Sequence, residues 1–371
     1  MSYGIVIRQK FQKIIIIYIT FYVKEKLSFN TPMPIKEAIS KLVNKQNLST
    51  EESLTAMTQI MEGNATDAQI ASFITALRMK GETVEEITGC TIAMRKKVVK
   101  IKIGDNTVVD TCGTGGDAKN TFNISTAAAF VVAGAGLKVA KHGNKASSGQ
   151  CGSADVLKRL GVNIEADVKV VEKCIEVANI GFLYAPLLHQ AMKYATGPRK
   201  EIGIRTIFNI IGPLANPAGA THRILGVYSE HMTLIMTEAL KMLGDQHAFV
   251  VHGLDGLDEI TTTDKTKVCE LTGNTIKSYY LNPEDFGIKK SKLSDLTVNT
   301  PDESATAIRE VLDGIRSPKR DVVLLNAAAA IIAGGLAEDF KEGLVIAAQS
   351  IDTGNAKSAL KKLMEISWQS P

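Results

Sequence analysis

Apolar residues follow a helical spacing in the stretch of chain after Met33. Ile35, Ala38 and Leu42 lie three or four positions apart, on one face of a helix. Three pairs with the Ser/Thr-x-x-Glu/Gln spacing of a capping box then mark further helix starts, namely Ser49 with Glu52, Thr66 with Gln69, and Thr83 with Glu86. The pattern predicts a small helical domain over residues 33–103, and we expect a helical segment around residues 190–218 to join it.

The pattern changes after Lys100, where short apolar runs rich in β-branched residues alternate with helical stretches. Such alternation is typical of a parallel sheet with helices on its faces. The predicted strands cover residues 107–112, 137–141, 180–185, 224–228 and 248–252. The predicted helices cover residues 125–135, 153–160 and 168–178, parts of the tail at 327–332 and 344–348 read as packed helices, and an alternating stretch at 271–281 predicts an edge hairpin. The predicted fold class is α/β, with a small N-terminal helical domain plus a larger α/β domain, residues 104–371, that has a mostly parallel central sheet and flanking helices.

Residues 1–32 form an N-terminal extension of different character. Residues 14–23 are strongly apolar and β-branched, but ten residues are too few to cross a bilayer, which takes about 20. A basic start and an apolar middle also suggest a signal peptide, yet no small-residue cleavage pattern follows. The favoured interpretations are a translation start at Met33, a disordered segment, or an added strand or arm.

Composition narrows the function classes. Of 371 residues, 45% are hydrophobic and 22% charged, which excludes a chain that is disordered as a whole. The net charge of +4 is too small for a dedicated nucleic-acid binder, although a local basic pocket for a small anion stays open. The five cysteines are odd in number and contain no C-x-x-C pair, which favours a reduced, cytoplasmic setting. We expect neither a nucleic-acid partner nor a membrane.

The clearest chemical signal is the stretch VVDTCGTGGDAKNTFNISTAAAF at residues 108–130. A buried strand ends in a turn containing Gly113 and Gly116, and a helix opens near Ser125 and Thr126. Glycines let the backbone approach an anion, and a helix N-terminus adds free N–H donors, so the stretch predicts a phosphate cradle. It matches neither a Walker loop nor G-x-G-x-x-G. Asp117 inside such a loop suggests a magnesium-phosphate ligand, because alone it would repel the anion.

Three further polar stretches follow in the chain. Lys141, Asn144 and Ser153 lie in a donor-rich loop after the next predicted strand, which is a binding loop or, equally, a solvated surface loop. The adjacent carboxylates in DGLDE, Asp258 and Glu259, suit a hard cation, although on this motif alone an exposed acidic pair is the more common case.

Arginines form the last of these stretches. Arg199 and Arg205 lie in GPRKEIGIR, next to Gly197-Pro198. An arginine's planar fork can hold a substrate carboxylate through two hydrogen bonds. The alternative is a structural ion pair with Glu201 or another acid.

Taken in order, CGTGGD, NIST, KHGN, GSADVL, HxAMK, RKxxGIRTIFNxxGPLxNP and DGxDE closely resemble the anthranilate phosphoribosyltransferase family, from about Met33 to the C-terminus. The resemblance implies a site in the cleft between the two domains and a homodimer formed through the helical domain. It also implies transfer of the phosphoribosyl group from phosphoribosyl pyrophosphate to the amine of anthranilate, with Mg2+, in tryptophan biosynthesis.

The resemblance also implies roles for single residues. The residues implied for the phosphoribosyl donor are Gly113, Gly116, Asp117, Thr121, Asn123, Ser125, Thr126, Lys141 and Ser153. Those implied for the metal ion are Ser125, Asp258 and Glu259. Those implied for anthranilate are Gly113, Asn144, His189 and Arg199, of which Asn144, His189 and Arg199 are also the catalytic candidates.

Three positions depart from the family pattern, and two other functions stay open. Gln190 stands where a proline is frequent, Lys145 replaces a frequent arginine, and Cys151 replaces a common serine. The nearest alternative enzyme is a pyrimidine nucleoside phosphorylase, which would not need the acidic pair. From another class, the chain could be a non-catalytic homologue that binds nucleic acid, which the weak net charge argues against.

Overall fold

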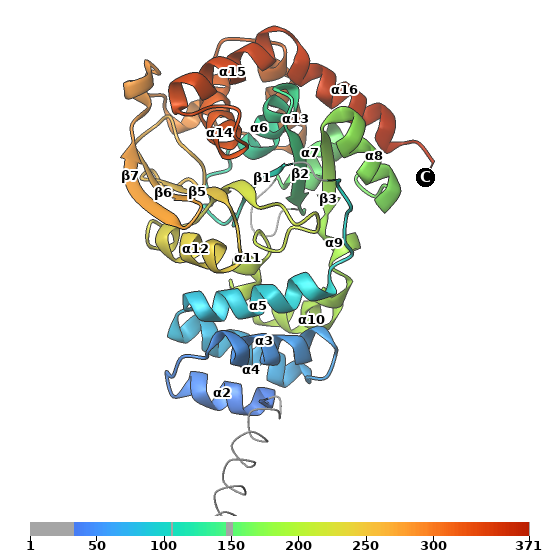
Figure 1. Ribbon diagram of the computed structural model, residues 1–371, viewed down its shortest axis with the longest axis vertical. Helices are drawn as coiled ribbons and strands as arrows, with labels where there is room; N and C mark the ends of the chain where they lie inside the picture. The colour runs from blue at the N-terminus through green and yellow to red at the C-terminus, as the bar shows by residue number, and fades with distance from the viewer. Residues whose placement is uncertain (1–32, 105–106, 146–150, 371) are drawn as a thin grey trace, which may run out of the picture.

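The computed structural model describes residues 33–104, 107–145 and 151–370 of the chain, so the predictions for residues 1–32 lie outside the described residues. Figure 1 shows an elongated molecule with a bundle of helices at one end and a layered α/β body at the other. The predicted fold class is confirmed. Among the described residues, no helix combines the length and the apolar character needed to cross a membrane.

The bundle contains the helix that the apolar spacing predicts and the three helices that the capping boxes predict. Its helices are α2 (Ile35–Val43), α3 (Thr50–Met61), α4 (Asp67–Lys80) and α5 (Val84–Lys97). All three capping boxes form, with each Ser or Thr side chain accepting a hydrogen bond from the backbone N–H three residues on. A later part of the chain, η1 (Gln190–Met192), α10 (Lys193–Ile202) and α11 (Ile207–Ile211), packs against α3, α4 and α5. The chain therefore returns to the bundle after building part of the sheet.

Seven strands form one sheet in the order β3-β2-β1-β4-β5-β6-β7. The strands are β1 (Val108–Gly113), β2 (Lys138–Gly143), β3 (Ile180–Tyr184), β4 (His222–Gly226), β5 (His247–Gly253), β6 (Thr266–Thr272) and β7 (Thr275–Leu281). The first five in this order run parallel, and β6 and β7 pair antiparallel at the edge. The order turns back at β1, which lies between β2 and β4. In open α/β sheets such a switch point opens a crevice at the carboxyl ends of the strands.

The edge hairpin is real, but its predicted bounds were wrong. The prediction at 271–281 began inside β6, whereas the hairpin starts at Thr266. Val268 and Cys269 are consecutive and both buried, so the first strand of the hairpin does not alternate and was not recognised.

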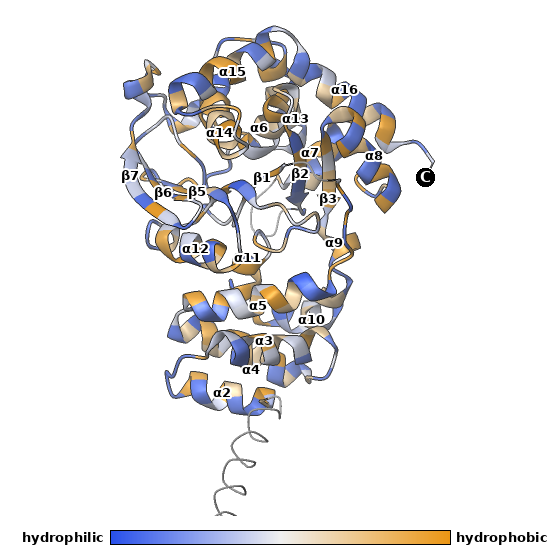
Figure 2. Cartoon of the chain, viewed as in Figure 1, coloured by the Kyte–Doolittle hydropathy of each residue, from blue (hydrophilic) through white to orange (hydrophobic). Residues whose placement is uncertain are grey.

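Helices cover both faces of the sheet. The large body contains α6 (Ile124–Gly134), α7 (Ser153–Arg159), α8 (Val168–Ala178), α9 (Ala185–Leu188), α12 (His231–Met242), α13 (Pro301–Leu312), α14 (Pro318–Ala333), α15 (Phe340–Asp352) and α16 (Asn355–Ser367), with the short turns η2 (Pro283–Phe286) and η3 (Leu293–Asp295). The alanine-rich helices α6 and α14 pack against each other and against the central strands, while α12 packs on β5 and β6 together with the bundle. In Figure 2 the outer helices α8 and α16 show hydrophilic and hydrophobic residues in turn, as expected for helices with one buried face.

A buried charged network joins the bundle to the sheet. Arg223 on β4 is fully buried, and its Nε lies 2.5 Å from Asp245 Oδ2 and its Nη1 3.9 Å from Asp110 Oδ2. Arg95 on α5 donates to the Leu214 carbonyl at 2.8 Å and lies 3.5 Å from the other oxygen of Asp245. A buried charge is tolerated only when it is paired and hydrogen-bonded, so this network sets how α5 sits against the strands.

We predict that Arg223→Met lowers the free energy of unfolding by about 3–5 kcal/mol, because it removes the buried guanidinium that faces Asp110 and leaves Asp245 only the longer contact with Arg95. Urea denaturation at pH 7 measures this loss. Arg316→Met is the matched control, since the exposed ion pair of Arg316 with Asp352 contributes at most about 1 kcal/mol. Equal losses in the two variants would contradict the role of the network.

Candidate active site

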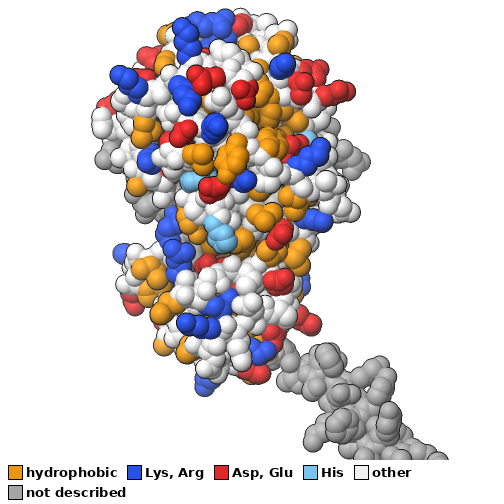
Figure 3. Space-filling model, turned by 90° about the vertical axis from the view of Figure 1, so that its left-hand side faces the viewer, with side chains coloured by type: hydrophobic (Ala, Val, Ile, Leu, Met, Phe, Trp, Pro, Cys, Tyr) orange, Lys and Arg blue, Asp and Glu red, His pale blue; other side chains and the backbone are white. Residues whose placement is uncertain are grey.

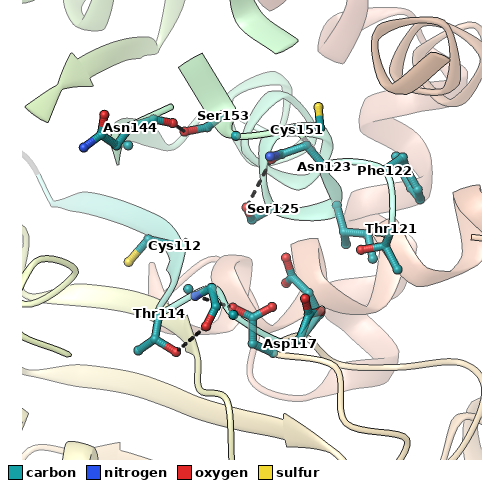
Figure 4. Close-up of a pocket in the computed structure, with 18 of the residues that line it drawn as sticks. Cys112, Thr114, Asp117, Thr121, Phe122, Asn123, Ser125, Asn144, Cys151 and Ser153 are labelled. Atoms are coloured by element: carbon teal, nitrogen blue, oxygen red, sulfur yellow. Dashed lines mark hydrogen bonds between the residues drawn. The ribbon is translucent and has the colours of Figure 1, made fainter. Parts of the chain in front are cut away.

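A pocket opens at the carboxyl ends of the central strands, where the strand order turns back. Its volume is about 280 Å³, and it is lined by the loop after β1, the start of α6, the end of β2 and the loop after β5. Figure 4 shows Asn144 and Ser153 on one side of this pocket and Thr114 and Asp117 on another. The two glycine-rich loops and the acidic motif therefore surround one space.

The loop after β1 has the backbone shape of an anion cradle. Gly115 and Gly116 have φ of 62° and 84°, in the left-handed region that favours glycine. The Asn123 side chain caps α6 by accepting the Thr126 N–H at 3.1 Å. The Ser125 N–H of the same turn acts on the Glu259 carboxylate and lowers its pKa in part, while the positive end of the helix dipole favours an anion in the pocket.

The acidic pair meets this loop directly. The Gly115 N–H donates to Asp258 Oδ2 at 2.8 Å. Asp258 comes this close because the ends of two neighbouring strands are glycines: a Cβ at Gly113 would lie 2.5 Å from Asp258 Oδ2, and a Cβ at Gly226 would overlap the Asp258 carbonyl. The phosphate loop and the acidic pair, which are far apart in the sequence, thus lie together in the fold.

The carboxylates of the acidic pair are buried and lie close to another negative charge. Burial raises the pKa of Asp258 to about 7, and the nearby Asp117 carboxylate adds to the shift. Burial and then Asp258 raise the pKa of Glu259 well above its ordinary value, although Lys141 lowers it in part. Three carboxylates that disfavour one another's charge are the surroundings in which a divalent cation binds well. Within the described residues, no three His, Cys, Asp or Glu side chains converge as a complete metal site, so a cation here would need hydroxyl, water or substrate oxygens as well.

Lys141 on β2 contacts both β1 and the start of α6. Its Nζ is buried, donates to the Thr111 carbonyl at 2.6 Å and lies 3.3 Å from Ser125 Oγ. Burial lowers the pKa of Lys141, and the negative charges of Asp110 and Glu259 oppose this shift. The Ser125 hydroxyl also lies 3.5 Å from Asn123 Oδ1, so it is oriented at the pocket wall next to the acidic pair.

Eleven of the fourteen predicted site residues line this pocket. They are Gly113, Gly116, Asp117, Thr121, Asn123, Ser125, Lys141, Asn144, Ser153, Asp258 and Glu259. Lys145 and Cys151, two of the departures from the family pattern, also line it, while Gln190 lies outside it in η1.

Thr126, His189 and Arg199 are not on the wall of this pocket. The Thr126 side chain is fully buried in α6. His189 lies behind the wall, where its Nε2 is 3.1 Å from Nε2 of His142, a pocket residue. Burial lowers the pKa of His142 to about 4 and that of His189 to about 3, so both rings are neutral at pH 7 and one donates a hydrogen bond to the other.

Arg199 lies in α10, on the bundle side of the pocket. Its guanidinium is 5.1 Å from the centre of the Phe208 ring, and burial lowers its pKa. It forms no ion pair with Glu201 or another acid among the described residues, so the structural alternative considered for this arginine is not seen. Arg199 is therefore a charged group that stays free for a ligand.

The sequence interpretation left two residues of this region without a role. Gly226 was not singled out, because its need for a missing Cβ arises only from contact with Asp258 across the fold. Arg205 was noted but not assigned. It donates to the Thr114 carbonyl at 3.2 Å, stacks 4.7 Å from the centre of the Tyr228 ring, and leaves its buried Nη1 unpaired. A Cβ at Gly116 would overlap this Nη1, so Arg205 supports the phosphate loop from outside the pocket.

Fold and site together define the class of this protein. The Glycosyl transferase family, a/b domain, matches residues 105–357, and the Glycosyl transferase family, helical bundle domain, matches residues 36–98. These matches correspond to the α/β body and the helical bundle described above.

Full-length relatives identify the family within this class. The chain is 53% identical over 331 residues to an anthranilate phosphoribosyltransferase of Acetivibrio thermocellus, covering 89% of this chain and 96% of the relative. It is 50% identical over 346 residues to that of Geotalea uraniireducens, covering 90% and 99%. The chain belongs to the anthranilate phosphoribosyltransferase family.

Solved structures agree with this assignment. The anthranilate phosphoribosyltransferase of Thermus thermophilus superposes with a TM-score of 0.85 at 37% identity, covering 90% of this chain and 99% of that one. The enzyme of Saccharomyces cerevisiae in complex with PRPP and Mg gives a TM-score of 0.82 at 31% identity, covering 90% and 97%. The same yeast enzyme in complex with 4-fluoroanthranilate gives a TM-score of 0.80 at 29% identity, covering 90% of this chain and 97% of that one.

The neutral histidine pair leads to a pH prediction. The unfolded chain protonates His189 near its ordinary pKa of 6.5, whereas the folded chain does so only near pH 3. The unfolded state therefore binds more protons between these values, and wild-type stability falls as the pH is lowered from 7 to 4. His189→Gln lacks this titration, so the wild type should lose about 3 kcal/mol relative to it over this range. Urea unfolding at a series of pH values measures the difference, and parallel pH profiles would contradict the buried neutral state.

Proposed function

We propose that this chain transfers the phosphoribosyl group of phosphoribosyl pyrophosphate to the amine of anthranilate, giving N-(5-phosphoribosyl)anthranilate and pyrophosphate in tryptophan biosynthesis. The observation that carries the proposal is the Gly115–Asp258 hydrogen bond, because it brings a phosphate cradle and a cation-binding acidic pair to one pocket. A single ligand that carries phosphates and a divalent cation can contact both.

The donor is a polyanion, and the pocket offers several kinds of positive partner. The loop of residues 113–117 and the first turn of α6 supply backbone N–H groups, and Lys141 supplies a buried ammonium. Thr121, Asn123 and Ser153 add side-chain donors around the same space. We assign these residues, together with Ser125, to the donor, while Thr126 contributes its place in the first turn of α6 rather than its buried hydroxyl.

The acidic pair suits Mg2+. Asp258, Glu259 and the Ser125 hydroxyl would hold the ion, with waters and phosphate oxygens completing its ligand shell. When bound, the cation would offset negative charge on the diphosphate group that leaves in the reaction. The yeast relative in complex with PRPP and Mg supports this assignment.

The acceptor lies on the bundle side in this proposal. Arg199 is half-buried and forms no ion pair with the described residues, which suits a carboxylate of the substrate. An aromatic amine is already neutral at pH 7, so attack on the anomeric carbon requires positioning rather than a strong base. The neutral pair of His142 and His189 fits this requirement, and Asn144 lines the same pocket as His142. The yeast relative in complex with 4-fluoroanthranilate supports an acceptor of this kind.

We also propose a cytoplasmic homodimer. The described cysteines are free thiols and four of the five are buried, which fits a reducing compartment. The bundle exposes large apolar side chains on its outside, with Val43 of α2 68% exposed and Met79 of α4 84% exposed, and a second copy would cover them. On the face shown in Figure 3, basic and acidic side chains are interspersed, which supports the absence of a nucleic-acid partner.

We predict that the purified chain forms fluorescent phosphoribosyl anthranilate in the presence of Mg2+. Excess EDTA should abolish this activity, and added Mg2+ should restore it. A fluorescence assay with both substrates measures this. Cleavage of pyrimidine nucleosides by phosphate, unaffected by EDTA, would favour the nucleoside phosphorylase instead. Salt-sensitive binding to single-stranded nucleic acid without turnover would favour the non-catalytic alternative.

We predict that Arg199→Ala raises the KM for anthranilate at least tenfold, because a charge-assisted contact to the acceptor carboxylate is lost. The KM for phosphoribosyl pyrophosphate should change less than twofold. Steady-state kinetics with each substrate varied in turn gives both values. Lys200→Ala is the matched control, since it removes the neighbouring charge of the same helix. Equal increases in both KM values would reject this role for Arg199.

A further inference from the structure

The acidic pair is followed at once by a residue whose backbone is held by a side chain from a distant helix. Ile260, next to Glu259, is fully buried. Its N–H donates to Asn326 Oδ1 at 3.0 Å, and its carbonyl accepts from Asn326 Nδ2 at 2.8 Å. One amide group on α14 thus binds both polar groups of the residue that follows the acidic motif.

Asn326 is an unusual residue for its place. It is 1% exposed and lies in the buried, alanine-rich middle of α14, between Leu325 and Ala327, which are both fully buried. A buried amide costs stability unless its hydrogen bonds are made. Here they are made: besides the two bonds to Ile260, Nδ2 donates to the Val322 carbonyl at 2.8 Å. An apolar residue would pack in this core without needing any hydrogen bond. The structure therefore indicates that an asparagine stands here because of its bonds to the loop and not because of the helix.

The loop needs such a restraint because its charges repel one another. Asp258 and Glu259 are adjacent carboxylates, and Asp117 faces them across the pocket. Ionised carboxylates this close to one another are unfavourable, so a backbone that keeps them together at the pocket needs support from outside the loop, beyond the hydrogen bond of Asp258 to the Gly115 N–H. Within the loop, Asp255 connects the two sides of the acidic pair, because its Oδ1 accepts the Leu257 N–H at 3.1 Å and its Oδ2 accepts the Thr261 hydroxyl at 2.6 Å.

We propose that Asn326 is a positioning residue for the acidic pair: it fixes the backbone at Ile260, so that the Asp258 and Glu259 carboxylates stay together at the pocket before the cation arrives. This inference rests on the proposed function, since it assigns the pair to Mg2+. Without the restraint, part of the binding free energy of the cation is spent on ordering the loop, and the apparent affinity for Mg2+ falls.

The test measures binding, not only activity. Calorimetric titration of phosphoribosyl pyrophosphate into the full-length protein, at a series of Mg2+ concentrations, gives the Mg2+ concentration at which donor binding is half-maximal. For Asn326→Ala we expect this midpoint to rise about tenfold. Saturating Mg2+ should restore most of kcat, and the KM for anthranilate should stay unchanged.

Ser350→Ala is the matched control. The Ser350 hydroxyl is buried in the same core and donates to the Val131 carbonyl of α6 at 2.7 Å, away from the acidic loop. Ser350→Ala should lower the urea concentration at the unfolding midpoint, as Asn326→Ala does. It should leave the Mg2+ concentration for half-maximal donor binding at the wild-type value. If Asn326→Ala does not fold, Asn326→Ser retains a smaller polar group and carries the same test.

The outcomes separate the two proposals. An unchanged Mg2+ midpoint in the Asn326 variant, with wild-type donor binding that depends on Mg2+, would overturn the positioning role and leave the proposed function standing. Wild-type donor binding that is independent of Mg2+ would overturn both.

Discussion

The whole site depends on the close approach of one carboxylate to the phosphate loop. Asp258 reaches the Gly115 N–H only because two adjacent strands, β1 and β4, end in Gly113 and Gly226, and neither position has room for a Cβ. This contact sets a negative group beside a cradle built for anions. In the proposed function, a cation bound to the acidic pair offsets this negative charge, so that a phosphate ligand can lie in the cradle beside it.

The rest of the fold supplies rigid support on either side of this contact. On the donor side, the alanine-rich helices α6 and α14 pack closely behind β1 and β4, and they carry the first-turn N–H groups and Asn326, respectively. On the acceptor side, the network of Arg223, Asp245 and Arg95 fixes α5 of the bundle against the sheet. The segment that contains Arg199 then packs on the bundle, so the two halves of the site are held by two different layers.

Local signals in the sequence were sufficient to predict many of the helices and strands and the phosphate loop. Capping boxes, strand patterns and the glycine-rich turn depend on residues a few positions apart, and all are found in the structure. The acidic pair could be recognised as a motif, but its meeting with the loop depends on strand order, which the pattern alone does not fix. Gly226, Arg205 and Asn326 could not be assigned, because each acts on a residue far away in the chain; Asn326 is 66 positions from Ile260. Family resemblance suggested His189, while Arg199 was also singled out by its arginine-rich stretch, and neither residue lines the pocket.

The most direct measurement is a crystal structure of this protein with phosphoribosyl pyrophosphate and Mn2+, whose anomalous scattering locates the cation. The account predicts an anomalous peak at coordination distance from Asp258 or Glu259 and from oxygens of a diphosphate that lies against residues 113–117. A diphosphate bound away from this loop, or a cation peak that no carboxylate of the pair contacts, would contradict it.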